Sequence, residues 1–193
     1  MSVYSGGIVT IPNILTVIRL VLIPFFVVAS LERNFVLAFG FFLVAAITDA
    51  LDGWIARRYN LRSRIGAVLD PTADKLMLIC GYVVYTLPTV ASYRLSPWLT
   101  FTVLVRDVLM VIAAYLLYTR INIRRFPPSL PGKISTITQV VALAATIAAN
   151  TALAPLVLPI MRLAHPAALL MTIYSGWDYL RRWDASLKSE AGG

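Results

Sequence analysis

The sequence has little charge, one cysteine and one histidine. Only 13% of its 193 residues are charged and 59% are hydrophobic, with a mean hydropathy of +0.79, whereas an average soluble domain has about 25% charged residues. The lone Cys80 excludes an internal disulfide and a cysteine metal cluster, and the lone His165 argues against a zinc site. The first twelve residues contain no Lys or Arg, which argues against the charged start of a signal peptide. These features indicate a membrane protein whose first apolar stretch we expect to be retained.

Six apolar stretches are each close to the length that crosses a bilayer as a helix, about 20 residues. Backbone that faces lipid must satisfy its own hydrogen bonds, which favours helices. We therefore predict an all-α, polytopic integral membrane protein of one domain, residues 1–193, built as a bundle of six transmembrane helices. Any chemistry must then come from intramembrane side chains and short loops. The predicted spans are 11–30, 35–58, 65–88, 97–118, 134–153 and 156–180.

The basic residues collect at the ends of the apolar spans. The net charge of +8 therefore indicates membrane topology and anionic lipid rather than nucleic acid. By the positive-inside rule, we expect both termini and the second and fourth connections to be cytosolic. The basic residues on that side are Arg57, Arg58, Arg62, Arg64, Arg120, Arg124, Arg125, Lys133, Arg181, Arg182 and Lys188.

Five acidic residues fall well inside the predicted spans. They are Asp49, Asp52, Asp70, Asp74 and Asp107. A charged side chain at the centre of a transmembrane helix costs about 3 kcal/mol on insertion scales, so such residues need partners and mark functional sites.

One stripe of a predicted helix carries acidic, small and basic residues. Asp49, Asp52, Gly53, Ala56 and Arg57 lie at offsets of 0, 3, 4, 7 and 8 residues, which is the spacing of a single helical face. The small residues leave room for a ligand close to the backbone. Arg57 supplies a planar donor fork that suits phosphate.

A second stripe begins the next predicted helix. Gly66, Asp70 and Asp74 are spaced by four residues, so they share a face. Because a short connection joins the two helices, we expect the stripes to face each other as an antiparallel pair.

Four carboxylates in one place repel each other unless cations neutralise them. Oxygen ligands without cysteine or histidine favour Mg²⁺, Mn²⁺ or Ca²⁺ over zinc. A pair of such ions bridged by carboxylates is typical of phosphoryl transfer. A proton relay or an ion pathway is the alternative for intramembrane carboxylates.

The two stripes resemble the signature of the CDP-alcohol phosphatidyltransferase family at every defined position. The pattern runs from Asp49 to Asp74 with eight fixed residues at fixed gaps. In that family, the acceptor hydroxyl attacks the phosphorus attached to the lipid moiety of a CDP-alcohol donor, and CMP leaves.

The resemblance implies a role for each matching residue. Asp49, Asp52, Asp70 and Asp74 would hold two divalent cations, Mg²⁺ or Mn²⁺. Asp74 would also be the general base for the acceptor hydroxyl, with Asp70 beside it in the catalytic group. The nucleotide-binding positions would be Asp52, Gly53, Ala56, Arg57 and Gly66.

Segments 11–19 and 70–75 are similar to those of the phosphatidylglycerophosphate synthase and eukaryotic-type cardiolipin synthase branch. The donor is then CDP-diacylglycerol, and the acceptor is glycerol 3-phosphate, our first choice, or phosphatidylglycerol. Both acceptors carry phosphate, which a cation can bind. The candidate acceptor-binding residues are Arg19, Lys75, Arg106 and Lys133. The first three lie inside predicted spans, and for them the alternative is structural pairing with Asp49, Asp107 or helix termini.

The resemblance also implies a homodimer in the lipid bilayer. We expect a multi-pass protein of a bacterial inner membrane whose active site opens toward the cytosol. A membrane prenyltransferase and a divalent-cation transporter are the competing functions. The transporter is disfavoured because the four defining carboxylates gather toward one face of the membrane.

Overall fold

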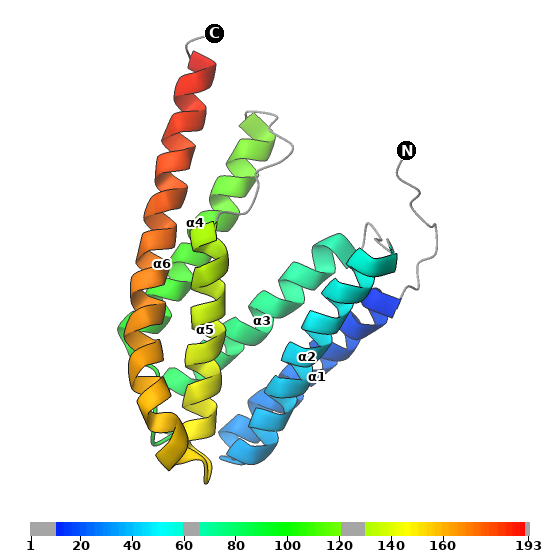
Figure 1. Ribbon diagram of the computed structural model, residues 1–193, viewed down its shortest axis with the longest axis vertical. Coiled ribbons are helices and arrows are strands. Elements are labelled where there is room, and N and C mark those ends of the chain that lie inside the picture. Colours follow the sequence, from blue (N-terminus) through cyan, green and yellow to red (C-terminus); the bar gives the residue numbers. More distant parts are fainter. Residues whose placement is uncertain (1–10, 60–65, 121–129, 192–193) are drawn as a thin grey trace. The chain divides into compact units, whose positions relative to one another are not determined.

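The computed structural model describes the chain over residues 11–59, 66–120 and 130–191, and its side chains over residues 15–49, 51, 75–112 and 130–181. These residues form six helices and no strand (Figure 1). The helices are α1 (Ile11–Leu31), α2 (Phe35–Tyr59), α3 (Gly66–Thr86), α4 (Pro97–Arg120), α5 (Leu130–Ala149) and α6 (Ala154–Ala191). The all-helical prediction is confirmed, and each predicted span corresponds to one helix.

Two helices depart from the predicted bounds. The fifth begins at Leu130 instead of residue 134 and ends at Ala149 instead of residue 153. Its early start includes Pro131, which the first turn of a helix tolerates because that turn needs no amide donor. The sixth continues to Ala191, beyond the predicted end at residue 180. Hydropathy detects the apolar part of a helix, so it missed this polar extension.

Two helical segments among the described residues are long and apolar enough to cross a bilayer. They are Leu130–Ala149 and Ala154–Arg181. Shorter apolar segments lie in the first three helices: Leu15–Leu31, Phe35–Asp49 and Lys75–Thr86. Among the described residues, length and composition therefore support two crossings directly, and the six predicted crossings stay a prediction.

The chain divides into two compact units. The first contains residues 1–94 and 146–155. Within it, α1 packs against α2 and α3, and α2 and α3 also touch (Figure 1). The rings of Phe26 and Phe42 lie 6.2 Å apart, and Phe26 stacks on Tyr85 at 6.4 Å. All three side chains are buried, so aromatic contacts join the three helices.

Short polar connections close the first unit. Asn34 caps α2 by accepting a hydrogen bond from the Leu37 amide at 3.2 Å. The Asn150 side chain lies just after α5, where its Oδ1 accepts from the amides of Ser92 and Tyr93, both at 3.0 Å. Its Nδ2 donates to the carbonyl of Thr146 at 2.8 Å. Asn150 therefore ends α5 and holds the connection that follows α3.

The second unit contains residues 95–145 and 156–193, and polar side chains join its helices. Gln139 Nε2 on α5 donates to Thr172 Oγ1 on α6 at 2.9 Å and to Ser135 Oγ at 3.2 Å. Arg106 Nη2 on α4 donates to Ser175 Oγ on α6 at 3.0 Å. Hydrogen bonds between helices are a typical means of association where hydrophobic burial gives no driving force.

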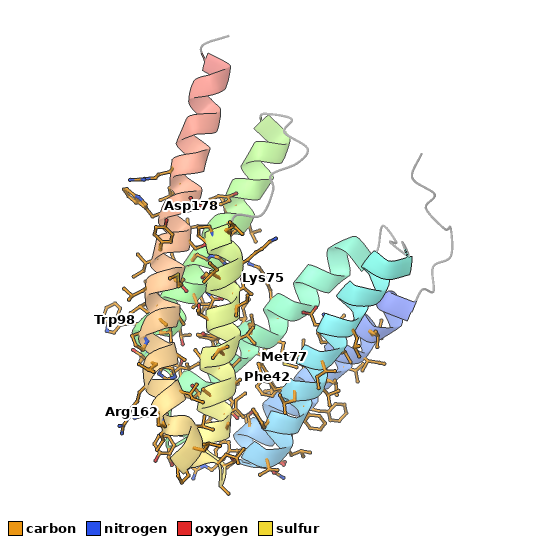
Figure 2. All side chains as sticks on the ribbon, in the orientation of Figure 1. Phe42, Lys75, Met77, Trp98, Arg162 and Asp178 are labelled. Carbon is orange, nitrogen blue, oxygen red and sulfur yellow. The ribbon has the colours of Figure 1, made fainter. Side chains whose placement is uncertain are left out.

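The distribution of side chains is inverted relative to a water-soluble protein. Val36, Trp98, Leu156 and Leu163 are each 71–76% exposed, and the Trp98 side chain points away from the helices (Figure 2). The buried polar and charged residues, in contrast, are Thr16, Arg19, Ser30, Thr100, Arg106, Asp107, Ser135, Gln139, Thr146, Thr172 and Ser175. Large exposed apolar surfaces mark contacts with membranes or proteins. This pattern agrees with helices that lie in lipid.

Candidate active site

Helix α2 positions the first predicted metal ligand, Asp49. Its Oδ1 lies 3.4 Å from Arg19 Nη2 on α1. The Arg19 side chain is 1% exposed, whereas the Asp49 side chain is 49% exposed. One side of the carboxylate therefore meets a buried cation, and the other side remains open to a ligand.

The first predicted stripe lies on one uninterrupted helix, because α2 continues to Tyr59. Helical geometry keeps positions at offsets 0, 3, 4, 7 and 8 on one face. The predicted helical context of this stripe is thus confirmed. Apart from that of Asp49, its side chains lie outside the described ones, at Asp52, Gly53, Ala56 and Arg57.

The second predicted stripe begins α3. Gly66 is the first residue of the helix, and Asp70 and Asp74 follow at one-turn intervals, so the three positions share a face. Their side chains also lie outside the described ones. That the two stripes face each other stays a prediction.

The donor set suits a hard divalent cation. Of the four predicted ligands, only Asp49 has a described side chain, and no group of three or more His, Cys, Asp or Glu side chains occurs among the described residues. Half-exposed Asp49 can offer an oxygen to a cation. All four ligands are carboxylates, the type that Mg²⁺ and Mn²⁺ prefer. The chemistry of these residues is compatible with divalent cations, and the presence of two ions stays a prediction.

The two buried arginines both have carboxylate partners. Arg19 meets Asp49, and Arg106 Nη1 donates to Asp107 Oδ1 at 2.7 Å. Arg106 also binds Ser175 and is 7% exposed, and its Nε has no hydrogen-bond partner among the described residues. The structural pairing considered from the sequence is thus present for both arginines.

The two predicted acceptor-binding lysines are more accessible. Lys75 on α3 is half-buried (Figure 2), and Lys133 near the start of α5 is exposed. Arg19 and Lys75 belong to the first unit, and Arg106 and Lys133 belong to the second. That these four cations form one acceptor site stays a prediction.

The polar residues that hold the second unit together were not predicted from the sequence. Ser175 receives a hydrogen bond from Arg106, and Thr172 receives one from Gln139. Spacing gave one available signal, because Thr172 and Ser175 are three residues apart and lie on one face of an otherwise apolar span. Such residues position helices rather than take part in chemistry.

An apolar pocket of about 350 Å³ opens in the second unit beside Arg106. Gly176 lies opposite that arginine, since a Cβ built there would be 4.0 Å from Arg106 Cγ. The walls come from α4 and α6 and are almost entirely hydrocarbon. They include Phe101, Val105, Leu109, Ile173 and Leu180.

Comparison with known proteins identifies the family. The family model described as CDP-alcohol phosphatidyltransferase matches residues 9–174. The chain is 33% identical over 158 residues to the cardiolipin synthase (CMP-forming) of Homo sapiens, covering 72% of this chain and 50% of that protein. This chain thus spans about half the length of that relative.

Two bacterial relatives match more of their own length. The CDP-diacylglycerol–glycerol-3-phosphate 3-phosphatidyltransferase of Aquifex aeolicus is 35% identical over 129 residues, covering 66% of this chain and 69% of that protein. A probable phosphatidylglycerophosphate synthase of Mycobacterium tuberculosis is 33% identical over 190 residues, covering 91% of this chain and 82% of that protein. The extent of the family match, the two helical stripes and these relatives agree: the chain belongs to the CDP-alcohol phosphatidyltransferase family.

Proposed function

We propose that this protein transfers the phosphatidyl group of CDP-diacylglycerol to glycerol 3-phosphate and releases CMP, as a phosphatidylglycerophosphate synthase. The observation that carries the proposal is the placement of the complete eight-residue family pattern on two helices, α2 and α3, with its first carboxylate, Asp49, half open. The relative named a probable phosphatidylglycerophosphate synthase covers 91% of the chain, which supports the choice of acceptor.

The four aspartates act on the diphosphate of the donor. Asp49, Asp52, Asp70 and Asp74 would hold two divalent cations, Mg²⁺ or Mn²⁺. When bound, these cations offset the charge that develops on the departing phosphate. Asp49 is the member whose surroundings are described, and its open side supports this role.

Asp74 accepts the proton of the acceptor hydroxyl, which makes the oxygen nucleophilic. That oxygen forms a bond to the phosphorus that carries the diacylglycerol, and the bond from this phosphorus to the oxygen of CMP breaks. Asp70, one turn away on α3, belongs to the same catalytic group.

The remaining motif residues bind the nucleotide. Gly53, Ala56 and Gly66 lack bulk, so cytidine and its phosphates approach the backbone of α2 and α3. Asp52 lies on the same face of α2. Arg57 donates hydrogen bonds to phosphate oxygens.

The phosphate of the acceptor needs cations. We assign this role first to Lys75 and Lys133, whose side chains are half-buried and exposed. Arg106 was a further candidate from the sequence, but its guanidinium is buried and binds Asp107 and Ser175, so we assign it mainly a structural role. Arg19, the fourth candidate from the sequence, contacts Asp49 on α2.

We infer a membrane topology from charge and helix length. The protein crosses the bilayer six times as one domain, with both termini and the active site on the cytosolic side, in a bacterial inner membrane. The many exposed apolar residues support this arrangement. A homodimer is a further proposal, which rests on the family resemblance.

Cardiolipin synthesis is the alternative, with phosphatidylglycerol as acceptor. The similarity to human cardiolipin synthase favours it, as does the Arg106–Asp107 pair, which resembles that side of the branch.

Purified full-length protein tests both reactions. It is incubated with CDP-diacylglycerol, Mg²⁺ and either glycerol 3-phosphate, phosphatidylglycerol, inositol phosphate or serine, and the lipid product is identified by mass spectrometry. We expect phosphatidylglycerophosphate and CMP, and no product when EDTA removes the metal. Cardiolipin as the main product would replace the first proposal by the second. Turnover of prenyl diphosphate, or divalent-cation flux without nucleotide, would contradict both.

A further inference from the structure

One ion pair joins α1 to the proposed metal site. Thr16, Arg19, Ile23, Phe26 and Ser30 are spaced by 3, 4, 3 and 4 residues on α1, and each is buried. This spacing forms one continuous stripe that faces the neighbouring helices. Arg19 therefore occupies a core position, where a lipid-facing or solvent-exposed role is excluded.

The facing stripe on α2 ends at the first metal ligand. Ala38, Phe42 and Ala45 are buried, and Asp49 follows them at the next position of the same 4, 3, 4 spacing. The ring of Phe26 contacts that of Phe42. Arg19 lies seven residues before Phe26 on α1, and Asp49 lies seven residues after Phe42 on α2, and these two side chains also meet. An antiparallel register set by the aromatic pair thus brings the ion pair together.

A buried arginine is retained only when its charge is compensated. Arg19 is 1% exposed, and its Nη2 lies 3.4 Å from Asp49 Oδ1. Because the Asp49 side chain is 49% exposed, the contact engages Oδ1 and leaves about half of the side chain open. The buried guanidinium of Arg19 thereby limits the directions in which Asp49 can present its other oxygen to a ligand.

We infer that Arg19 is a positioning residue for Asp49: it orients the first metal-binding carboxylate from α1 and does not bind the acceptor phosphate. This inference rests on the proposed function, because it takes Asp49 to be a metal ligand. Partners behind a metal ligand orient it, and their loss weakens metal binding by about 10- to 100-fold.

Binding of Mn²⁺ to the purified full-length protein in detergent, followed by electron paramagnetic resonance without donor or acceptor, tests the inference. We expect R19Q to bind Mn²⁺ about 10- to 100-fold more weakly than the wild type. The KM for glycerol 3-phosphate, measured at saturating Mg²⁺, should not change. R19K keeps the charge but loses the planar fork, so it should bind with intermediate affinity.

Two further variants isolate the pair. R33Q makes the same substitution in the same unit, at an exposed residue that donates to the Thr89 carbonyl at 2.7 Å, and it should bind Mn²⁺ like the wild type. The double variant R19Q/D49N should bind no more weakly than D49N alone, because two residues that act through one contact are not additive.

The outcomes separate the inference from the proposed function. Wild-type or tighter Mn²⁺ binding by R19Q overturns the inference, as does a raised KM for glycerol 3-phosphate with Mn²⁺ binding intact. If R19Q fails to fold, R19K decides: weaker Mn²⁺ binding supports the inference, and wild-type binding overturns it. A wild-type protein that binds no Mn²⁺ overturns the metal site and the inference together.

Discussion

At the residue scale, the charged side chains inside the helices fall into two groups. Arg106 and Asp107 satisfy each other at 2.7 Å and are both buried, so their main effect is on stability. Asp49 is half open although a buried arginine touches it, which is the state expected of a ligand that must still accept a partner. The two carboxylates both contact an arginine, so their exposure distinguishes them: buried Asp107 stabilises the fold, and half-exposed Asp49 can bind a ligand.

The proposed general base gives the first prediction. D74N should lower CMP release from CDP-diacylglycerol by about 10²- to 10⁴-fold, the usual contribution of a positioned base. The carboxamide keeps the size of the side chain but cannot accept the proton. CMP release is measured with glycerol 3-phosphate and Mg²⁺, and circular dichroism confirms the helical content.

E32Q is the matched control for that substitution. Glu32 is an exposed carboxylate in the turn after α1, and its conversion to the amide should leave turnover unchanged. Full turnover by D74N would remove Asp74 from the reaction.

The buried Arg106–Asp107 pair gives the second prediction. D107A should lower the free energy of unfolding by about 3–5 kcal/mol, because it leaves a buried guanidinium without its carboxylate. The double variant R106M/D107L removes both charges and should recover most of that loss. Denaturant unfolding in detergent measures both values, and a D107A protein as stable as the wild type would contradict a structural role.

At the element scale, the α1–α2 seam positions the site. Its register is set by packing, since Phe26 and Phe42 meet two turns from the Arg19–Asp49 pair. Lipid tails are as apolar as the side chains, so van der Waals contact rather than hydrophobic burial stabilises such a seam. The precision of the proposed metal site should therefore depend on the shape of residues remote from it.

Neighbouring phenylalanines on α1 test this view. F26A should lower the free energy of unfolding by roughly 1–3 kcal/mol, less than the 3–5 kcal/mol common in water-soluble cores. Phe26 is fully buried, whereas Phe25 is 55% exposed and its ring lies 6.1 Å from that of Phe41 on α2, so F25A should cause a smaller loss than F26A. Unfolding in detergent compares the two. Equal losses would contradict the placement of the seam.

At the scale of the whole molecule, the outward-facing apolar residues and the inward-facing polar residues indicate that lipid surrounds the helices. Helix α6 has 38 residues and is about 57 Å long at 1.5 Å per residue, whereas the hydrocarbon core of a bilayer is about 30 Å thick. We therefore expect its polar C-terminal part, beyond Arg181, to extend outside the hydrocarbon region, on the side that the positive-inside rule predicts to be cytosolic.

Accessibility of introduced cysteines tests this topology. In a C80A background, S92C should react with a membrane-impermeant maleimide added to intact cells, because Ser92 is exposed and lies in a connection that the proposed topology places on the outer side. S189C should react only after the membrane is permeabilised. The opposite pattern would invert the protein, and labelling of both from outside would contradict the three crossings predicted between Ser92 and Ser189.

Local sequence patterns were sufficient for the helices and for the family pattern. Runs of apolar residues located all six helices, and the spacing of the aspartates placed each stripe on one helical face, since helical periodicity is a property of neighbouring residues. The end of α6 could not be found in this way because helix formation continues where hydropathy stops.

Sequence alone determined the helices, their faces and the family, and tertiary structure alone decided which charges meet. Arg19 could have bound an acceptor, a helix end or Asp49, and the antiparallel packing of α1 on α2 brings it to Asp49. Ser175 likewise gained a role only when α6 packed beside Arg106. These partners are 30 and 69 residues apart, so no local pattern relates them, and only the register between packed helices brings them into contact.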